Sequence, residues 1–288
     1  MKTSVHKLTN GIVLTLQTSA EHARPKSPTV ILCHGFCGIR EILLPDFAAA
    51  FTRAGFATVT FDYRGFGDSD GERGRLVPAM QIADIVSVIQ WVREQPQLDG
   101  ERIGLWGTSF GGCHVFAAAA QDAEIKCIVS QLAFADGEEI VTGRMDNDEK
   151  TAFLATLNKM ADRQQLTGKE MFVGITRVLS DAESKAFFEE NRARYPKMDI
   201  KIPFLTVRET LQYHPARSAA QVSCPTLVVI AEKDRVNSPE QGRALYEAVG
   251  GQNKKLYEEK DARHYDIYSG EHFRRVIQVQ TEWFIQNL

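Results

Sequence analysis

The stretch Arg102-Ile-Gly-Leu-Trp-Gly-Thr-Ser-Phe-Gly-Gly112 decides the fold, because a short apolar run passes directly into a glycine-rich turn around a serine. Residues 102–106 favour a buried strand, and residues 110–120 favour a helix. A Gly-x-Ser-x-Gly turn between a strand and a helix is so tight that its flanking positions must lack bulk. The strain holds the serine hydroxyl out at the carboxyl end of the sheet. Ser109 is therefore the candidate nucleophile.

A glycine-rich turn can also be an ordinary strand-to-helix connection or a phosphate-binding loop. The G-x-x-x-x-G-K-[ST] spacing of a phosphate loop is absent, and no G-x-G-x-x-G follows the first strand of the expected sheet. No cluster of His, Asp or Glu has the spacing of metal ligands. The sequence therefore implies no cofactor and no metal.

Strands and helices alternate on both sides of the serine turn, which predicts an α/β fold with a mostly parallel wound sheet and helices on both faces. Apolar and polar residues alternate on either side of Asn10-Gly11, so the chain is expected to open with an antiparallel hairpin at the sheet edge. The expected strands are 5–8, 12–18, 29–33, 56–61, 102–106, 125–130, 225–230 and 254–258, and the expected helices are 41–54, 78–93, 110–120, 239–249 and 271–286.

The alternation stops between residues 131 and 221, where the sequence becomes charged, helix-favouring and rich in phenylalanine. We interpret residues 131–221 as a helical cap inserted into one core made of residues 1–130 and 222–288. Without the cap, about 200 of the 288 residues remain, which suits a single domain. The cap phenylalanines either line an acyl pocket or simply form a core, and they are Phe153, Phe172, Phe187 and Phe188.

A serine hydroxyl needs a base to become a nucleophile, and that base needs a carboxylate to hold its tautomer. Asp234 and His264 each follow the end of an expected strand, and wound sheets place their sites at that edge. They are the candidate acid and base, with Glu232 as the alternative acid. Six other histidines compete with His264 for the role of base, and most of them are expected to be surface or structural residues; they are His6, His22, His34, His114, His214 and His272.

The chain order serine, aspartate, histidine resembles that of the α/β-hydrolase superfamily. The resemblance extends to His34-Gly-Phe36 after the first buried strand and to Asp62-Tyr-Arg-Gly-Phe-Gly-Asp-Ser-Asp-Gly71 after the second. It covers nearly the whole chain except the cap. It implies an oxyanion hole formed by the backbone N–H groups of Phe36 and Phe110.

The resemblance also implies a cofactor-free serine hydrolase that cleaves a small-molecule ester or thioester through an acyl-enzyme. The pattern is similar to the group of fungal polyketide transferases and thiohydrolases and to dienelactone-hydrolase-like proteins. Transfer of the acyl group from a thioester to an alcohol is therefore an alternative. A non-catalytic ligand-binding protein of the same fold is an alternative of another class.

Several residues near these motifs have structural interpretations. His34 and Asp62 are expected to brace loops through hydrogen bonds, because nucleophile, base and acid are already assigned without them. Arg64 and Asp68 are interpreted as structural as well. Cys113 lies inside an expected helix and is interpreted as a packed thiol.

The charge composition argues against nucleic acid as a partner. The chain has 34 Lys and Arg and 37 Asp and Glu, which give a net charge of −3, so it has no excess of basic residues with which to bind nucleic acid.

The cysteines and the apolar runs indicate the compartment. Five scattered cysteines without a CxxC pair indicate a reducing compartment. No signal-peptide pattern and no apolar run of about 20 residues is present, so a cytoplasmic protein without a membrane span is expected. The oligomeric state stays open.

Overall fold

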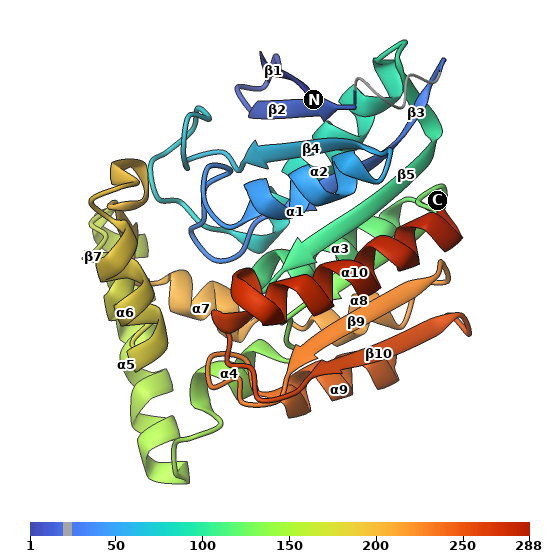
Figure 1. The fold of residues 1–288 in the computed structure, drawn as a ribbon. Helices are drawn as coiled ribbons and strands as arrows, with labels where there is room; N and C mark the ends of the chain where they lie inside the picture. The colour runs from blue at the N-terminus through green and yellow to red at the C-terminus, as the bar shows by residue number, and fades with distance from the viewer. Residues whose placement is uncertain (20–24) are drawn as a thin grey trace.

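An eight-stranded sheet runs through the part of the chain that the computed structural model describes, residues 1–19 and 25–288. Its strand order is β1-β2-β4-β3-β5-β6-β9-β10 (Figure 1). The pairs β1–β2 and β2–β4 are antiparallel, and all other neighbours are parallel. The strands are β1 Lys2–Lys7, β2 Val13–Thr18, β3 Ser27–Cys33, β4 Ala57–Asp62, β5 Leu98–Thr108, β6 Cys127–Gln131, β9 Thr226–Ala231 and β10 Lys254–Glu259.

Helices cover both faces of the sheet, because successive side chains of a strand point to opposite sides. Ile31 and Leu105 pack on the face that carries α2, α3 and α9, whereas Leu32 and Trp106 pack on the face that carries α1 and α10 (Figure 1). The predicted α/β class with a mostly parallel wound sheet is confirmed. The bounds of these helices are α1 Leu44–Arg53, α2 Pro78–Glu94, α3 Phe110–Gln121, α9 Pro239–Ala248 and α10 Gly270–Asn287.

Most of the core helices and strands begin or end a few residues away from the positions that the sequence predicts. The largest difference at a helix start is at α1, which begins at Leu44 rather than at residue 41. Leu43 has a φ of 64°, outside the helical region, and Pro45 occupies the first turn, where a missing N–H costs nothing. These two residues set the start of the helix.

The segment 131–221 lies mainly beyond the carboxyl ends of the parallel strands, with α5 and α6 at one side of the molecule (Figure 1). It also contains a two-stranded antiparallel sheet, β7–β8, which the sequence analysis did not predict. Strands of three residues are too short to show a periodicity. Its elements are α4 Gly137–Thr142, α5 Asn147–Thr167, β7 Phe172–Gly174, η1 Ile175–Arg177, α6 Ala182–Asn191, η2 Pro196–Met198, β8 Lys201–Pro203, α7 Thr206–Leu211 and α8 Pro215–Ala219.

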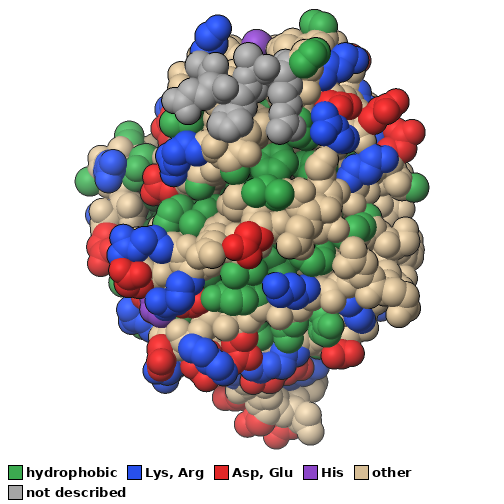
Figure 2. Space-filling model, turned by 45° about the vertical axis from the view of Figure 1, so that its right-hand side comes forward, with side chains coloured by type: hydrophobic (Ala, Val, Ile, Leu, Met, Phe, Trp, Pro, Cys, Tyr) green, Lys and Arg blue, Asp and Glu red, His purple; other side chains and the backbone are tan. Residues whose placement is uncertain are grey.

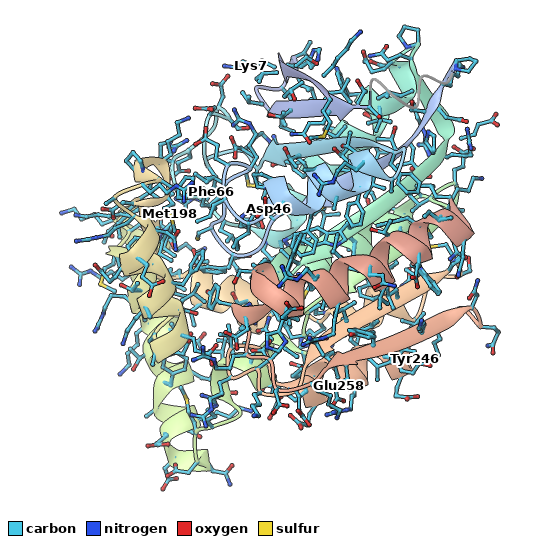
Figure 3. All side chains as sticks on the ribbon, viewed as in Figure 1. Lys7, Asp46, Phe66, Met198, Tyr246 and Glu258 are labelled. Carbon is cyan, nitrogen blue, oxygen red and sulfur yellow. The ribbon has the colours of Figure 1, made fainter. Side chains whose placement is uncertain are left out.

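Ion pairs and apolar contacts join this segment to the loop that follows β4. Arg75 binds Glu170 with both terminal guanidinium nitrogens, at 2.7 and 2.5 Å. Phe66, in the loop after β4, and Met198, in the segment, belong to one buried cluster and lie near each other (Figure 3). By contrast, α8 contacts α3 and α9 on a face of the sheet. The division into a core of 1–130 plus 222–288 and a cap of 131–221 stays a prediction.

The surface carries charges of both signs. On the face shown in Figure 2, Lys and Arg side chains alternate with Asp and Glu side chains, in keeping with a net charge of only −3. Within residues 1–19 and 25–288, no helix combines the length and the apolar character that crossing a membrane requires.

Candidate active site

Ser109 lies at the junction between β5 and α3, as the sequence predicts. It has a φ of 54° and a ψ of −119°, a strained conformation that turns its side chain away from the strand. A Cβ atom on Gly111 would lie 2.3 Å from the carbonyl oxygen of Cys33, and one on Gly107 would lie 2.2 Å from that of Gly111. The backbone N–H of Ser109 donates to Gln131 at 2.7 Å. The turn therefore requires its glycines, and it presents the hydroxyl at the carboxyl ends of the strands.

His264 and Asp234 form a buried pair. The Nδ1 atom of His264 lies 2.6 Å from Oδ2 of Asp234, and the two side chains are 3% and 1% exposed. The other carboxylate oxygen of Asp234 accepts the backbone N–H groups of Val236 and Asn237, at 2.8 and 2.9 Å. These donors fix the carboxylate. In this contact the His264 tautomer with its proton on Nδ1 donates to the carboxylate, and Nε2 of that tautomer can accept a proton.

Glu232, the alternative acid, lies apart from the imidazole. Its carboxylate accepts the backbone N–H of Asp261 at 2.8 Å and pairs with Lys260 at 3.2 Å, and its side chain is 37% exposed. These contacts lower the pKa of Glu232, first through the Asp261 N–H and then through the ammonium group of Lys260. The geometry therefore favours Asp234 as the partner of His264.

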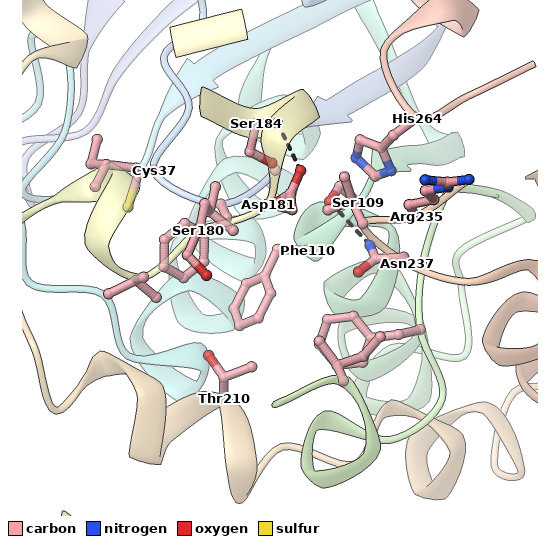
Figure 4. Close-up of a pocket in the computed structure, with 18 of the residues that line it drawn as sticks. Cys37, Ser109, Phe110, Ser180, Asp181, Ser184, Thr210, Arg235, Asn237 and His264 are labelled. Atoms are coloured by element: carbon pink, nitrogen blue, oxygen red, sulfur yellow. Dashed lines mark hydrogen bonds between the residues drawn. The ribbon is translucent and has the colours of Figure 1, made fainter. Parts of the chain in front are cut away.

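Ser109 and His264 both line one cavity (Figure 4). The Ser109 hydroxyl oxygen accepts a hydrogen bond from Nδ2 of Asn237 at 3.3 Å. Asn237 is not among the site residues predicted from the sequence. Its position three residues after Asp234, in a loop at the carboxyl end of β9, was the available signal.

The loop after β3 packs directly on the serine turn. A Cβ atom on Gly35 would lie 3.1 Å from that of Ser109, and the rings of Phe36 and Phe110 meet edge to face with centroids 5.7 Å apart. Phe110 is the first residue of α3, so its N–H has no partner within the helix. Both phenylalanines line the cavity. Their N–H groups remain the predicted oxyanion hole.

His34 braces this loop in the way the sequence analysis expected. Its Nε2 atom lies 2.9 Å from the carbonyl oxygen of Ile42. A Cβ atom on Gly38 would lie 1.6 Å from the ring, so only glycine fits there. Burial lowers the pKa of His34 to about 4, and the imidazole stays neutral at neutral pH. A neutral, hydrogen-bonded ring suits a structural role.

The motif after β4 is likewise held by ion pairs. Asp62 accepts the backbone N–H of Arg40 at 2.7 Å and pairs with its guanidinium group, which also binds Asp68 at 2.8 Å. Arg64 pairs with Asp84 at 2.5 Å. The contacts of Arg40 connect the loop after β3 to the end of β4 and its loop, and the Arg64 pair connects that loop to α2. They agree with the structural interpretation of Asp62, Arg64 and Asp68.

Cys113 is fully buried one turn after the serine, with its sulfur 3.5 Å from the carbonyl oxygens of Ser109 and Phe134. Burial raises the pKa of this thiol. The thiol is therefore protonated at neutral pH, and the interpretation as a packed side chain agrees with the structure.

The cavity above Ser109 has a volume of about 720 Å³. Phe153, Phe187 and Phe188 line it, together with other apolar side chains of the segment 131–221. Phe172 does not line the cavity: it is on β7, with 42% of its side chain exposed. The pocket interpretation therefore fits three of the four phenylalanines, and neither interpretation fits Phe172.

Three of the remaining histidines have polar contacts with residues other than the predicted triad. His6, His214 and His272 have polar partners of their own, namely Ser4, Asp136 and Glu259. His22 lies outside the described residues. No cluster of three or more His, Cys, Asp or Glu that could hold a metal ion occurs among residues 1–19 and 25–288.

His114 is fully buried in α3, with Nδ1 2.9 Å from the hydroxyl of Tyr213 and Nε2 2.9 Å from Oε1 of Gln81. Burial lowers the pKa of His114 from 6.5 to about 3. Between these pH values the unfolded chain binds a proton at this position and the folded chain does not. Acidification from pH 6.5 therefore removes stability, and the loss ends near the folded pKa.

We expect wild type to lose stability with falling pH more steeply than His114→Gln, which cannot take up this proton. The difference in the free energy of unfolding should change by about 1.4 kcal/mol per pH unit, or roughly 2 kcal/mol between pH 6.5 and 5. Urea unfolding of both proteins at pH 7, 6 and 5 measures this difference. Parallel pH dependences would contradict the prediction.

Comparisons with known proteins agree with this architecture. A family model described as alpha/beta hydrolase fold matches residues 28–271. An uncharacterized 31.7 kDa Escherichia coli protein from the traX-finO intergenic region is 66% identical over 100% of both chains. The thiohydrolase aneE of Aspergillus aculeatus is 29% identical over 91% of this chain and 86% of its own. The solved structure of DcsB with its substrate analogue has a TM-score of 0.83 and 25% identity, covering 99% of this chain and 98% of that one.

Proposed function

The chain belongs to the alpha/beta hydrolase fold family, and from this premise we propose that it is a serine hydrolase that cleaves a carboxylic ester or thioester. The hydrogen bond of 2.6 Å between His264 and the buried Asp234 carries the proposal, because it prepares the imidazole as a base beside Ser109. The similarity to a protein named thiohydrolase supports a thioester substrate.

In the first half of the reaction, the Ser109 oxygen attacks the acyl carbonyl carbon while Nε2 of His264 takes the hydroxyl proton. Asp234 stabilises the imidazolium that forms. The carbonyl oxygen becomes an oxyanion, which the N–H groups of Phe36 and Phe110 bind. One such donor contributes roughly 3 kcal/mol to transition-state stabilisation in a known serine protease. His264 then returns its proton to the leaving alcohol or thiol as the acyl-enzyme forms.

In the second half, His264 takes a proton from water, and the resulting hydroxide attacks the acyl carbon. The acid leaves as the Ser109 oxygen regains its proton from His264. The apolar part of the cavity, including Phe153 and Phe187, suits the hydrocarbon portion of an acyl group. An alcohol bound in place of water would accept the acyl group by the same chemistry.

We expect wild type to be labelled by a fluorophosphonate probe and to hydrolyse a short p-nitrophenyl ester, whereas Ser109→Ala should do neither. Both proteins should share one melting temperature within a few degrees, which controls for misfolding. A folded wild type that is neither labelled nor active would contradict the proposal and favour a non-catalytic ligand-binding protein.

A second assay distinguishes hydrolysis from acyl transfer. Wild type is incubated with an acyl thioester, with and without small alcohols, and the products are identified by mass spectrometry. Free acid as the sole product supports the hydrolase. An acylated alcohol that Ser109→Ala does not form would show that the protein is an acyltransferase.

A further inference from the structure

We propose that Asn237 is a catalytic residue: its side-chain amide directs the Ser109 proton toward His264 and stabilises negative charge on the Ser109 oxygen. The inference rests on the proposed function. It adds a fourth side chain to Ser109, His264 and Asp234, and this side chain contacts the reacting oxygen of Ser109. It starts from the contact of 3.3 Å between Nδ2 of Asn237 and Oγ of Ser109 (Figure 4).

The orientation of the amide follows from its second contact. Nδ2 lies 2.7 Å from the backbone carbonyl oxygen of Leu132, which can only accept a hydrogen bond. The nitrogen of the amide must therefore be on this side, because the amide oxygen would repel the carbonyl. The NH₂ group has two hydrogens. One serves Leu132, and the other faces the Ser109 hydroxyl.

The surroundings of Asn237 and of Leu132 hold the amide in this orientation. The backbone N–H of Asn237 donates to Asp234 at 2.9 Å, and the residue is only 6% exposed. Leu132 has a φ of 55°, rare for a residue of its type, and its N–H donates to Val229 at 2.8 Å. This strained conformation is held in the buried loop after β6, where the carbonyl meets Asn237. Strain of this kind persists where the surroundings enforce it, and it is concentrated at functional sites.

The direction of the hydrogen bond determines where the serine proton points. A hydroxyl has one hydrogen and two acceptor lone pairs, and the Asn237 N–H occupies one lone pair. The hydroxyl hydrogen thus stays available for Nε2 of His264. When that proton moves to His264 and the bond from Oγ to the acyl carbon forms, Asn237 already donates to the oxygen that loses the proton.

The same bond changes strength along the reaction. It is strongest while Oγ carries partial negative charge, during attack and again when Oγ leaves the acyl carbon in the second half. In the free enzyme Oγ is a neutral hydroxyl, and in the acyl-enzyme it is an ester oxygen, a weaker acceptor. Interactions that are stronger in the transition state than in the ground state raise kcat and leave KM unchanged.

We therefore expect Asn237→Ala to lower kcat on a p-nitrophenyl ester roughly 10- to 100-fold, the effect of losing a hydrogen bond to a charged group. KM should change by less than about threefold. The second-order rate of fluorophosphonate labelling should fall by a similar factor, because labelling uses the same nucleophile. Asn237→Asp keeps the side-chain size but cannot donate when ionised, and it should lose at least as much kcat.

Ser130→Ala is the matched control. The Ser130 hydroxyl is buried and donates to the carbonyl oxygen of Gly112 at 2.8 Å, so this variant also removes a side-chain bond to a backbone carbonyl beside the serine turn. It does not remove a contact with the Ser109 hydroxyl. Its melting temperature should fall, while kcat and the labelling rate stay within about threefold of wild type.

The possible results separate the two proposals. If wild type is active, Ser109→Ala is inactive and both Asn237 variants keep kcat within threefold, the role of Asn237 is refuted and the serine hydrolase stands. If Ser130→Ala loses as much kcat as Asn237→Ala, the effect reflects general disturbance of the turn, and the role is again refuted. A wild type without labelling or turnover overturns both proposals.

Discussion

We expect His264→Ala to lower kcat on a p-nitrophenyl ester by about 10⁶-fold, as much as Ser109→Ala does. In the proposed mechanism the imidazole is the base for the attacking serine and the acid for the leaving group, so neither half of the reaction would proceed without it. In a serine protease, loss of the nucleophile or of the base alone costs about as much as loss of all triad members. The double variant Ser109→Ala/His264→Ala should therefore be no slower than either single variant.

Steady-state kinetics of the three variants test this expectation, with thermal unfolding to verify that each one folds. His272→Ala is the matched control. His272 also places Nδ1 near a carboxylate, 2.7 Å from Glu259, but it does not line the cavity, so kcat should be unchanged. Losses of Ser109→Ala and His264→Ala that add up in the double variant would contradict a triad acting as a unit.

We expect Asp234→Asn to lower kcat by about 10⁴-fold while the fold is kept, as in a serine protease with the same exchange. The amide oxygen can still accept the backbone N–H groups of Val236 and Asn237. Its NH₂ group, however, donates to Nδ1 of His264, which moves the imidazole proton to Nε2. An imidazole in that tautomer cannot take a proton from Ser109.

Glu232→Gln tests the alternative acid under the same conditions. Glu232 contacts Lys260 and the backbone of Asp261 at the surface, so we expect kcat within threefold of wild type and a melting temperature close to that of wild type. Measurement of kcat for both variants decides the assignment. A severe loss in Glu232→Gln with a mild one in Asp234→Asn would show that Asp234 is not the acid.

The sequence did not fully separate Asp234 from Glu232 as the candidate acid, and the reason is geometric. Glu232 and Asp234 both follow β9 and differ by two positions, so strand-end placement alone cannot separate them. The N–H of Glu232 still bonds to Glu259 across the sheet edge, which leaves its side chain with the surface residues of the β10 end. At Asp234 the chain has turned, and the carboxylate points inward to His264.

The phenylalanines of residues 131–221 show what local composition cannot predict. Phe187 lines the cavity and stacks on Tyr265, with ring centroids 4.4 Å apart, whereas Phe172 is exposed on β7. Both occur in charged, helix-favouring sequence. Which of them faces the cavity depends on how short elements pack over the sheet, and no periodicity records that packing.

The sequence by itself determined the α/β class and the position of the serine turn, and it predicted Ser109, Asp234 and His264 as nucleophile, acid and base. Each of these follows from local constraints: a turn too tight for side chains, and strand ends that meet at one sheet edge. The tertiary structure decided the features that require distant residues to meet. Asn237 contacts Ser109 across 128 positions because the strained carbonyl of Leu132 and the loop after β9 converge there, and only the packed sheet brings them together.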